Sequence, residues 1–225
     1  MRLPLLAAVA STLATPASAQ TARDILISAA FTARDRPSAL ARIDAALTSA
    51  TAALARNPAD REARLQRAIA IGYRGKLRRD RGDAQAARRG FEALVAADPR
   101  DAEPQMALAG FHLGAIEELG PLLARTALGA RRASGLRAET ASLAAGGGRA
   151  IFPAVAAHNR ILLDPGDTAG ARALAEAALK ARIARPEDRI MQRHAAQILP
   201  LLRAGNGKAA AALAETLMPF GRVAR

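Results

Sequence analysis

The chain has 225 residues, a formal net charge of +13 at pH 7, no cysteine and only 3% aromatic residues. The lack of cysteine excludes disulfides and a lipidated cysteine anchor, and the few aromatic side chains argue against a platform for single-stranded nucleic acid. The basic residues are mostly arginines, scattered singly and in pairs rather than in blocks. This pattern favours solvated helix faces; the alternative is an electrostatic partner such as an acidic protein, a lipid headgroup or an anionic envelope polymer.

Residues 1–19 have the pattern of a Sec-type signal peptide. A basic start precedes an apolar run over residues 3–13, and residues 17–19 (Ala-Ser-Ala) supply the small side chains of a cleavage site. The apolar run is shorter than the roughly 20 residues of a membrane-spanning helix, which disfavours the alternative of an N-terminal membrane anchor. We therefore expect cleavage after Ala19, an all-α domain over residues 20–225, no membrane span, and a periplasmic or secreted location without a lipid anchor.

Two helices are predicted at the start of the mature chain. The first covers residues 20–34 and ends at Arg36-Pro37-Ser38, where Pro37 suits the first turn of the next helix. The second continues to Asn57-Pro58 and carries apolar residues at helical spacing. Towards the end of this helix, Ala46, Ala50, Ala53 and Pro58 have a spacing of small residues and proline similar to that in the second helix of the central unit that follows.

The central unit, residues 60–101, has the pattern of two antiparallel helices. Leu65, Ile69, Tyr73 and Leu77 form the apolar face of the first helix, and Asp60 precedes it as a capping residue. Gly82 is predicted to end that helix and Asp83 to cap the second. The second helix has an inner stripe and an outer face, the stripe formed by Ala87, Phe91, Leu94 and Val95 and the water-facing side by Arg88, Arg89 and Glu92.

This unit resembles the tetratricopeptide repeat (TPR) family. Gly75, Ala87, Phe91 and Pro99 stand at spacings of 12, 4 and 8 residues, with a glycine at the expected turn. The small residues would let the helices approach, the aromatic would fill the gap, and the proline would end the unit. The match is partial, because the positions of two family aromatics and a later alanine hold Ile71, Arg78 and Leu94. An ordinary helical hairpin is the alternative.

The middle of the chain continues with helical segments. Residues 103–118 are apolar around much of the helix, so this helix is expected to be well buried. Gly120-Pro121 interrupts it, and a helical pattern resumes over residues 122–128. Gly129 and Gly135 are read as sites of close backbone approach, and Gly146-Gly147-Gly148 as a hinge or exposed turn.

Four further helices complete the chain. One runs from Ile151 to Asp164-Pro165-Gly166-Asp167, and the next contains Leu174, Ala178 and Ile183. Residues 185–188 (Arg-Pro-Glu-Asp) open another, and a tight turn at Gly205-Asn206-Gly207 leads into the last hairpin. With nine or ten helices and no alternating strand pattern, the predicted fold is an all-α, TPR-like array of antiparallel helix pairs, either a right-handed α-solenoid or a compact helical bundle.

No catalytic, metal or cofactor site is predicted. His112, His158 and His194 fall in three different predicted helices, and none has a second ligand at metal-binding spacing. The three consecutive glycines lack the lysine and preceding strand of a phosphate loop. We found no paired acids suited to acid–base chemistry.

The TPR resemblance implies a concave wall lined by the first helix of each pair. In the central unit it would place Ile69, Gly72, Lys76 and Arg79 on that wall, where the two cations could receive a carboxylate of a partner; the alternative is that they are solvated helix-end cations. The expected function is a non-catalytic binding or assembly module for a protein or peptide in the cell envelope, without nucleic acid. The alternatives are a helical small-molecule binder serving an envelope transporter and an envelope enzyme with a dispersed site.

Overall fold

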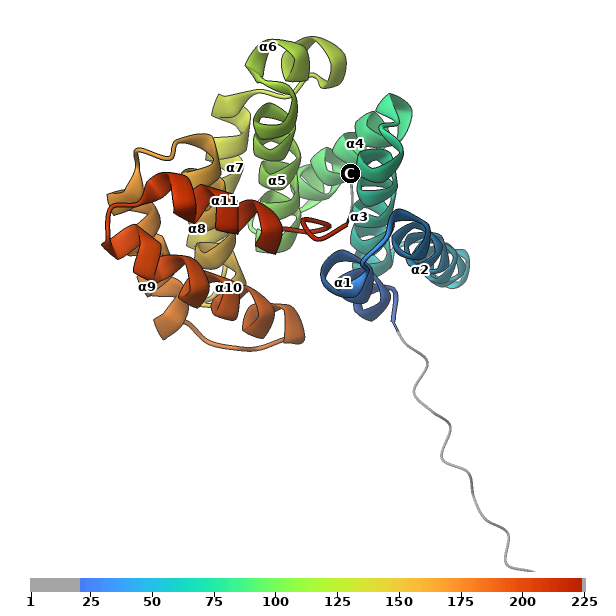
Figure 1. Ribbon diagram of the computed structural model, residues 1–225. Coiled ribbons are helices and arrows are strands. Elements are labelled where there is room, and N and C mark those ends of the chain that lie inside the picture. The colour runs from blue at the N-terminus through green and yellow to red at the C-terminus, as the bar shows by residue number, and fades with distance from the viewer. Residues whose placement is uncertain (1–20, 224–225) are drawn as a thin grey trace, which may run out of the picture.

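The computed structural model describes residues 21–223, and these form helices joined by short turns (Figure 1). The predicted signal peptide and its cleavage site lie outside the described residues. No strand occurs in residues 21–223, which contain one isolated bridge between Arg149 and Arg182. The elements in chain order are α1 (Ala22–Thr32), α2 (Arg36–Arg56), α3 (Arg61–Arg78), α4 (Arg81–Ala97), α5 (Ala102–Leu119), α6 (Pro121–Leu123), the π-helix η1 (Ala124–Leu128), α7 (Arg132–Ala145), α8 (Ile151–Leu163), α9 (Thr168–Lys180), α10 (Pro186–Arg203) and α11 (Gly207–Leu217).

The predicted all-α fold is confirmed, and its helices pack as successive pairs. The pairs are α1 with α2, α3 with α4, α5 with α7, α8 with α9, and α10 with α11. This packing is compatible with both architectures expected from the sequence, a solenoid or a bundle. Within residues 21–223, no helix is both long and apolar enough to cross a membrane.

Aspartates begin many of these helices, because a carboxylate accepts hydrogen bonds from backbone N–H groups that lack a partner in the first turn. Asp35 caps α2, Asp60 caps α3, Asp80 caps α4 and Asp167 caps α9, each accepting from the backbone N–H three residues further on. The predicted cap at Asp60 is thus confirmed, and of the two residues that could cap α9, Asp167 and Thr168, the structure selects Asp167. An aspartate thus fixes where each of these four helices starts.

The predicted boundary between α3 and α4 is wrong by a few residues. Helix α3 ends at Arg78, and Arg79 takes the left-handed conformation with φ of 55°. Asp80, rather than Asp83, is the cap of α4, which leaves Gly82 inside the first turn. A glycine was expected at the left-handed position because it has no Cβ; here an arginine occupies it.

The interior of the central pair is as predicted. Phe91 is only 5% exposed and belongs to a core cluster with Leu65 and Leu94. Small residues bring the two helices together: a Cβ on Gly75 would lie 2.9 Å from the backbone nitrogen of Ala84. A larger residue at position 75 would therefore force α3 and α4 apart.

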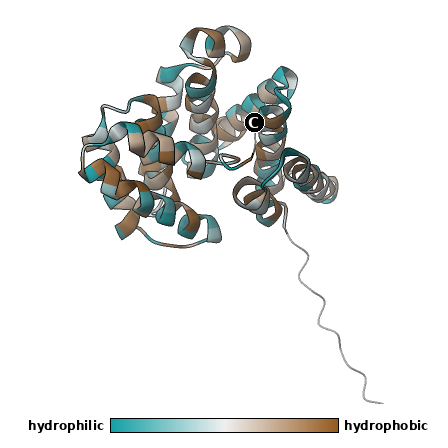
Figure 2. Cartoon of the chain, viewed as in Figure 1, coloured by the Kyte–Doolittle hydropathy of each residue, from teal (hydrophilic) through white to brown (hydrophobic). Residues whose placement is uncertain are grey.

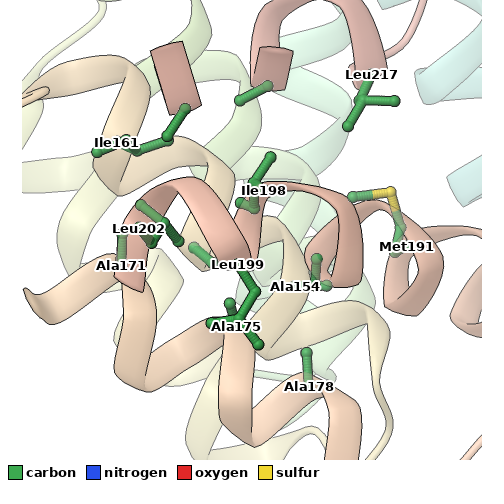
Figure 3. Close-up of a cluster of buried hydrophobic side chains, with 14 of the residues drawn as sticks. Ala154, Ile161, Ala171, Ala175, Ala178, Met191, Ile198, Leu199, Leu202 and Leu217 are labelled. Carbon is green, nitrogen blue, oxygen red and sulfur yellow. The ribbon is translucent and has the colours of Figure 1, made fainter. Parts of the chain in front are cut away.

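The largest hydrophobic core lies in the C-terminal half and is shown in Figure 3. Alanines on α8 and α9 face larger side chains of α10, which include Met191, Ile198, Leu199 and Leu202. Figure 2 shows hydrophobic and hydrophilic segments alternating along the helices, as expected when each helix buries one face. A second core, built from α1, α2 and α3, also includes Phe220 and Val223 of the C-terminal segment.

The C-terminal segment returns to the first helix. The backbone N–H of Phe220 donates to the carbonyl oxygen of Ala30 at 2.8 Å, and its ring meets Tyr73 edge-on at 4.9 Å between centroids. Phe31 of α1 packs edge-on against His194 of α10 at 5.6 Å. The first and last helix pairs are therefore in contact, and the array of pairs is closed on itself.

The middle of the chain differs most from prediction. Residues 132–145 form α7, for which no helix was predicted because its small and polar residues show no apolar stripe. The expected helical pattern at residues 122–128 is divided between α6 and η1. A Cβ on Gly135 would lie 2.5 Å from a methyl carbon of Leu113, which agrees with the predicted close approach.

Two smaller expectations are corrected. Ile183 lies beyond the end of α9 and is 39% exposed, since α9 ends at Lys180. Arg88 faces water only in part, because its guanidinium donates to the carbonyl oxygen of Leu128 at 2.9 Å and its side chain is 27% exposed. The triple glycine forms a turn with positive φ at Gly147 and Gly148, and the backbone N–H of Arg182 donates to the oxygen of Gly148 at 2.8 Å.

Candidate functional site

Charged side chains from five parts of the chain meet in a network that we call the ionic cluster. Its members lie at or just before the N-terminal ends of α1, α3, α5, α8 and α10. They are Arg23, Arg61, Glu62, Asp101, Glu103, Arg149, Arg185, Glu187 and Asp188. The cluster thus connects the first helix of every pair.

Glu103 occupies the centre of the ionic cluster. Its carboxylate accepts hydrogen bonds from Arg149 at 2.7 Å, Arg23 at 2.8 Å, Arg185 at 3.0 Å and Arg61 at 3.1 Å. Its side chain is only 9% exposed. Glu103 therefore links four arginines that come from four separate segments of the chain.

The other acids complete the pairing. Arg23 binds both oxygens of Glu62 and one oxygen of Glu187, at 2.7–2.8 Å. Arg61 makes a two-point contact with Asp101. Arg149 binds Asp188, a side chain with no exposed surface. Acidic residues in the first turn of a helix also interact favourably with its dipole, which explains their recurrence at these ends.

Asp188 has a further role in the backbone. Its Oδ2 accepts from the N–H groups of Ala184 and Arg185 at 2.9 and 2.8 Å, and its Oδ1 accepts from Ile151 at 3.3 Å. A buried carboxylate is stable only when its lone pairs are satisfied in this way. Asp188 therefore fixes the start of α10 against the start of α8.

The electrostatic state of Glu103 follows from these contacts. Burial on its own would raise the pKa of the carboxyl, but hydrogen bonds from Arg149 and Arg23 and the charges of Arg23 and Arg185 lower the pKa to about 2. A general acid or base at neutral pH needs a pKa near 7. Glu103 has the opposite shift, which suits a permanent structural anion.

The three histidines lie apart from the ionic cluster. His158 is fully buried, and its Nδ1 donates to the carbonyl oxygen of Ala154 at 2.8 Å. Burial lowers the pKa of His158, and burial together with the charge of His158 lowers the pKa of His194 to about 4. His112 accepts a long hydrogen bond of 3.4 Å from the backbone N–H of Arg131. Among residues 21–223 no group of three or more candidate ligands could hold a metal ion.

A small, partly open cavity lies beside His194, between α1, α10 and the C-terminal segment. Its volume is about 20 Å³, and Phe31, Met218 and Arg222 contribute to its walls. This is room for about one water molecule. The cavity does not offer the space that a small-molecule ligand requires.

The four residues predicted to line a partner groove differ in burial, with Ile69 and Gly72 half-buried and Lys76 and Arg79 exposed. Ile69 packs against two hydrophobic cores. Gly72 faces α4, because a Cβ there would lie 3.2 Å from the Cβ of Ala87. Lys76 and Arg79 are exposed near the C-terminal end of α3, and the Lys76 amine lies 3.9 Å from Glu118 of α5. The structure therefore brings the two cations to the solvent and leaves the other two residues in helix packing.

At the same end of α5, three leucines are exposed. Leu119 is 39%, Leu122 76% and Leu123 53% exposed. They surround a shallow open hollow together with Gly120, Pro121 and Thr126. In Figure 1 this segment, labelled α6, forms an outer edge of the protein. We call Leu119, Leu122 and Leu123 the leucine lip.

Searches against protein-family models, curated proteins and solved structures found no match to this chain. The resemblance of the central unit to the TPR family therefore stays a prediction from the sequence.

Proposed function

We propose that this protein is an exported, non-catalytic, TPR-like module that binds a protein or peptide partner in the cell envelope. The observation that carries the proposal is the ionic cluster, which holds the first helices of all five pairs at one end. A scaffold fixed in this way presents its remaining surfaces in a constant arrangement. Preorganised surfaces bind with a smaller loss of conformational entropy.

The state of the charged groups favours binding over catalysis. In the ionic cluster each carboxylate lies against at least one arginine, and the pKa of Glu103 is lowered rather than brought near neutrality. With its pKa lowered in this way, the Glu103 carboxylate stays ionised at pH 7. The small volume of the cavity beside His194 likewise favours a surface partner over a ligand bound in that cavity.

The surface that we assign to the partner is the C-terminal end of α3. Lys76 and Arg79 are exposed there, and the protein carries a formal net charge of +13. A partner segment with a carboxylate would complement these cations. Charge complementarity of this kind guides association and selects among partners.

The test compares two double variants that remove the same charge. Lys76→Gln with Arg79→Gln should weaken binding of the partner by about tenfold, because a specific carboxylate contact is lost. Arg67→Gln with Arg89→Gln removes two exposed cations from the same helix pair and should leave the affinity nearly unchanged. The partner is first isolated from envelope extract with the mature protein, then purified and titrated by calorimetry at moderate salt.

Equal losses in the two double variants would reject a specific site and leave only a general basic surface. Export is tested separately, by N-terminal sequencing of the protein from the periplasm. A mature chain that begins at Gln20 supports the assignment, whereas an intact Met1 in the membrane fraction contradicts it.

A further inference from the structure

The leucine lip is an exposed apolar segment held in a fixed backbone conformation. Gly120 has φ of 76° and turns the chain out of α5 into Pro121. Ala124 is fully buried, and its carbonyl oxygen accepts hydrogen bonds from the N–H groups of Gly129 and Ala130. The segment is therefore anchored on its inner side while its leucines face outward.

The lip is unusual among the apolar side chains of the described residues. Leu136, Leu179 and Ile183 are also exposed, at 39–40%, but Leu122 and Leu123 reach 76% and 53% and are adjacent in the chain. Single exposed leucines are ordinary in soluble proteins, whereas a contiguous group marks a contact surface.

The size of the lip limits what can cover it. The exposed areas of its three leucines together are smaller than the area of two fully exposed leucines. A stable contact with a second copy or a folded protein buries about 800 Å² on each partner, which is far more than this segment offers. A bilayer does not require a large complementary surface, because a few inserted apolar side chains and nearby cations add their free energies.

Cations stand where a bilayer contact would use them. Arg125 is exposed within the lip segment, and Arg131 and Arg132 are exposed at the start of α7. The backbone N–H of Arg131 contacts His112, seven residues before Leu119 on α5. At 1.5 Å per residue this places the start of α7, with Arg131 and Arg132, beside the part of α5 that lies about 10 Å along the helix from Leu119.

Two acidic residues also lie at this end of α5, and neither is free. Glu118 lies 3.9 Å from Lys76. Glu117 likewise has an interaction partner. Three exposed arginines, Arg125, Arg131 and Arg132, therefore stand near two acids that already have partners.

We propose that the leucine lip docks this protein on an anionic phospholipid surface, with Leu122 and Leu123 inserted and Arg125, Arg131 and Arg132 at the headgroups. The lip adjoins the proposed partner site on α3, because Lys76 lies 3.9 Å from Glu118, the residue before Leu119. It would hold the binding module at a membrane face without a membrane-spanning segment.

The absence of tryptophan from the chain allows a direct test. Leu122→Trp places a single reporter in the lip, and Leu179→Trp places one at an exposed leucine of α9 as the matched control. The probes are vesicles of phosphatidylglycerol with phosphatidylethanolamine, and vesicles of phosphatidylcholine alone. We expect a blue shift and quenching by brominated lipid acyl chains for Leu122→Trp with the anionic vesicles, and no change for Leu179→Trp.

Co-sedimentation of variants without a reporter separates the lip from general charge. Leu122→Ser with Leu123→Ser should weaken partition to anionic vesicles by about tenfold or more, while Leu179→Ser with Ile183→Ser should not. If Leu122→Ser with Leu123→Ser did not reduce partition to anionic vesicles, the proposal would be overturned. This holds even if replacing Arg125, Arg131 or Arg132 reduced it. An unshifted Leu122→Trp that responds instead to the purified partner would also overturn it and make the lip a protein contact.

Discussion

Replacing Glu103 with glutamine would test the ionic cluster most directly. The substitution keeps the shape of the side chain but removes its negative charge. That charge contacts all four arginines of the ionic cluster, which are Arg23, Arg61, Arg149 and Arg185. A lowering of the pKa from 4.5 to about 2 corresponds to roughly 3 kcal/mol of stability at neutral pH, at 1.36 kcal/mol for each unit. Breaking a buried ion pair typically costs a similar 3–5 kcal/mol.

The pH dependence gives the prediction a sign. The pKa of Glu103 is lower in the folded protein than its ordinary value of 4.5. Its contribution to stability is therefore complete above pH 4.5 and is lost as the pH falls from 4.5 through about 2. The difference in unfolding free energy between the parent protein and Glu103→Gln should be constant near neutrality and should shrink over that acidic window.

Urea denaturation followed by circular dichroism measures this difference, provided that the unfolding is two-state. For a protein of this size, roughly 3 kcal/mol corresponds to a decrease in melting temperature of about 6–12 °C. The matched control is Glu176→Gln, which breaks an ion pair with Arg203 whose side chains are 38% and 60% exposed. That surface pair should contribute only about 0–1 kcal/mol. If Glu103→Gln cost no more than Glu176→Gln, or kept its full effect at pH 2, the reasoning would be refuted.

Two further predictions concern the core and the histidines. Phe91→Ala should destabilise the protein by roughly 3–5 kcal/mol, because the side chain is 5% exposed between α3 and α4 and its removal leaves a cavity. Thermal melts measure this loss. The control is Arg89→Ala, at an exposed position of the same helix, which should change the stability very little. The pKa of His194 is lowered from 6.5 to about 4 by burial and by the charge of His158. As the pH falls from 6.5 towards 4, this histidine is therefore protonated in the unfolded chain but not in the folded protein, and the stability of the folded protein declines. His194→Leu should reduce that slope in denaturation measurements over the same range, and an unchanged slope would assign it to other groups.

The sequence predicted the helix pairs well where an apolar stripe and a capping residue agreed. The unit formed by α3 and α4 has both, and its buried Phe91 lies as expected. Prediction failed for α7, where alanine, glycine and serine allow close packing on α5 without producing a stripe. It also misplaced the turn after α3, because the left-handed residue is Arg79 and not a glycine.

The ionic cluster was not recognised from the sequence, although a signal was present. Its contacts join residues separated by 39 positions for Arg23 and Glu62, 40 for Arg61 and Asp101, 46 for Arg149 and Glu103, and 39 for Arg149 and Asp188. These separations correspond to one helix pair each. A search for charged residues recurring at that period, at the start of the first helix, would have found it.

The contact between Arg23 and Glu187 could not be anticipated in this way. The two residues are 164 positions apart, and they meet only because the last pair returns to the first. Local patterns determine how one pair packs on the next, but closure depends on the small rotation accumulated over all pairs. The same limit applies to Phe220, whose contact with Ala30 follows from closure rather than from its own neighbours in sequence.

Helix α5 connects the two features that matter most for the proposed roles. Its first turn carries Glu103 in the ionic cluster, and its last residue is Leu119 of the lip. Because Glu103 and Leu119 are 16 residues apart in α5, about 24 Å of helix separate the buried charges from the exposed leucines. Substitutions at that distance act independently when they share no partners. A loss of lipid docking without a loss of stability would therefore identify the lip itself, whereas a loss of both would indicate damage to the scaffold.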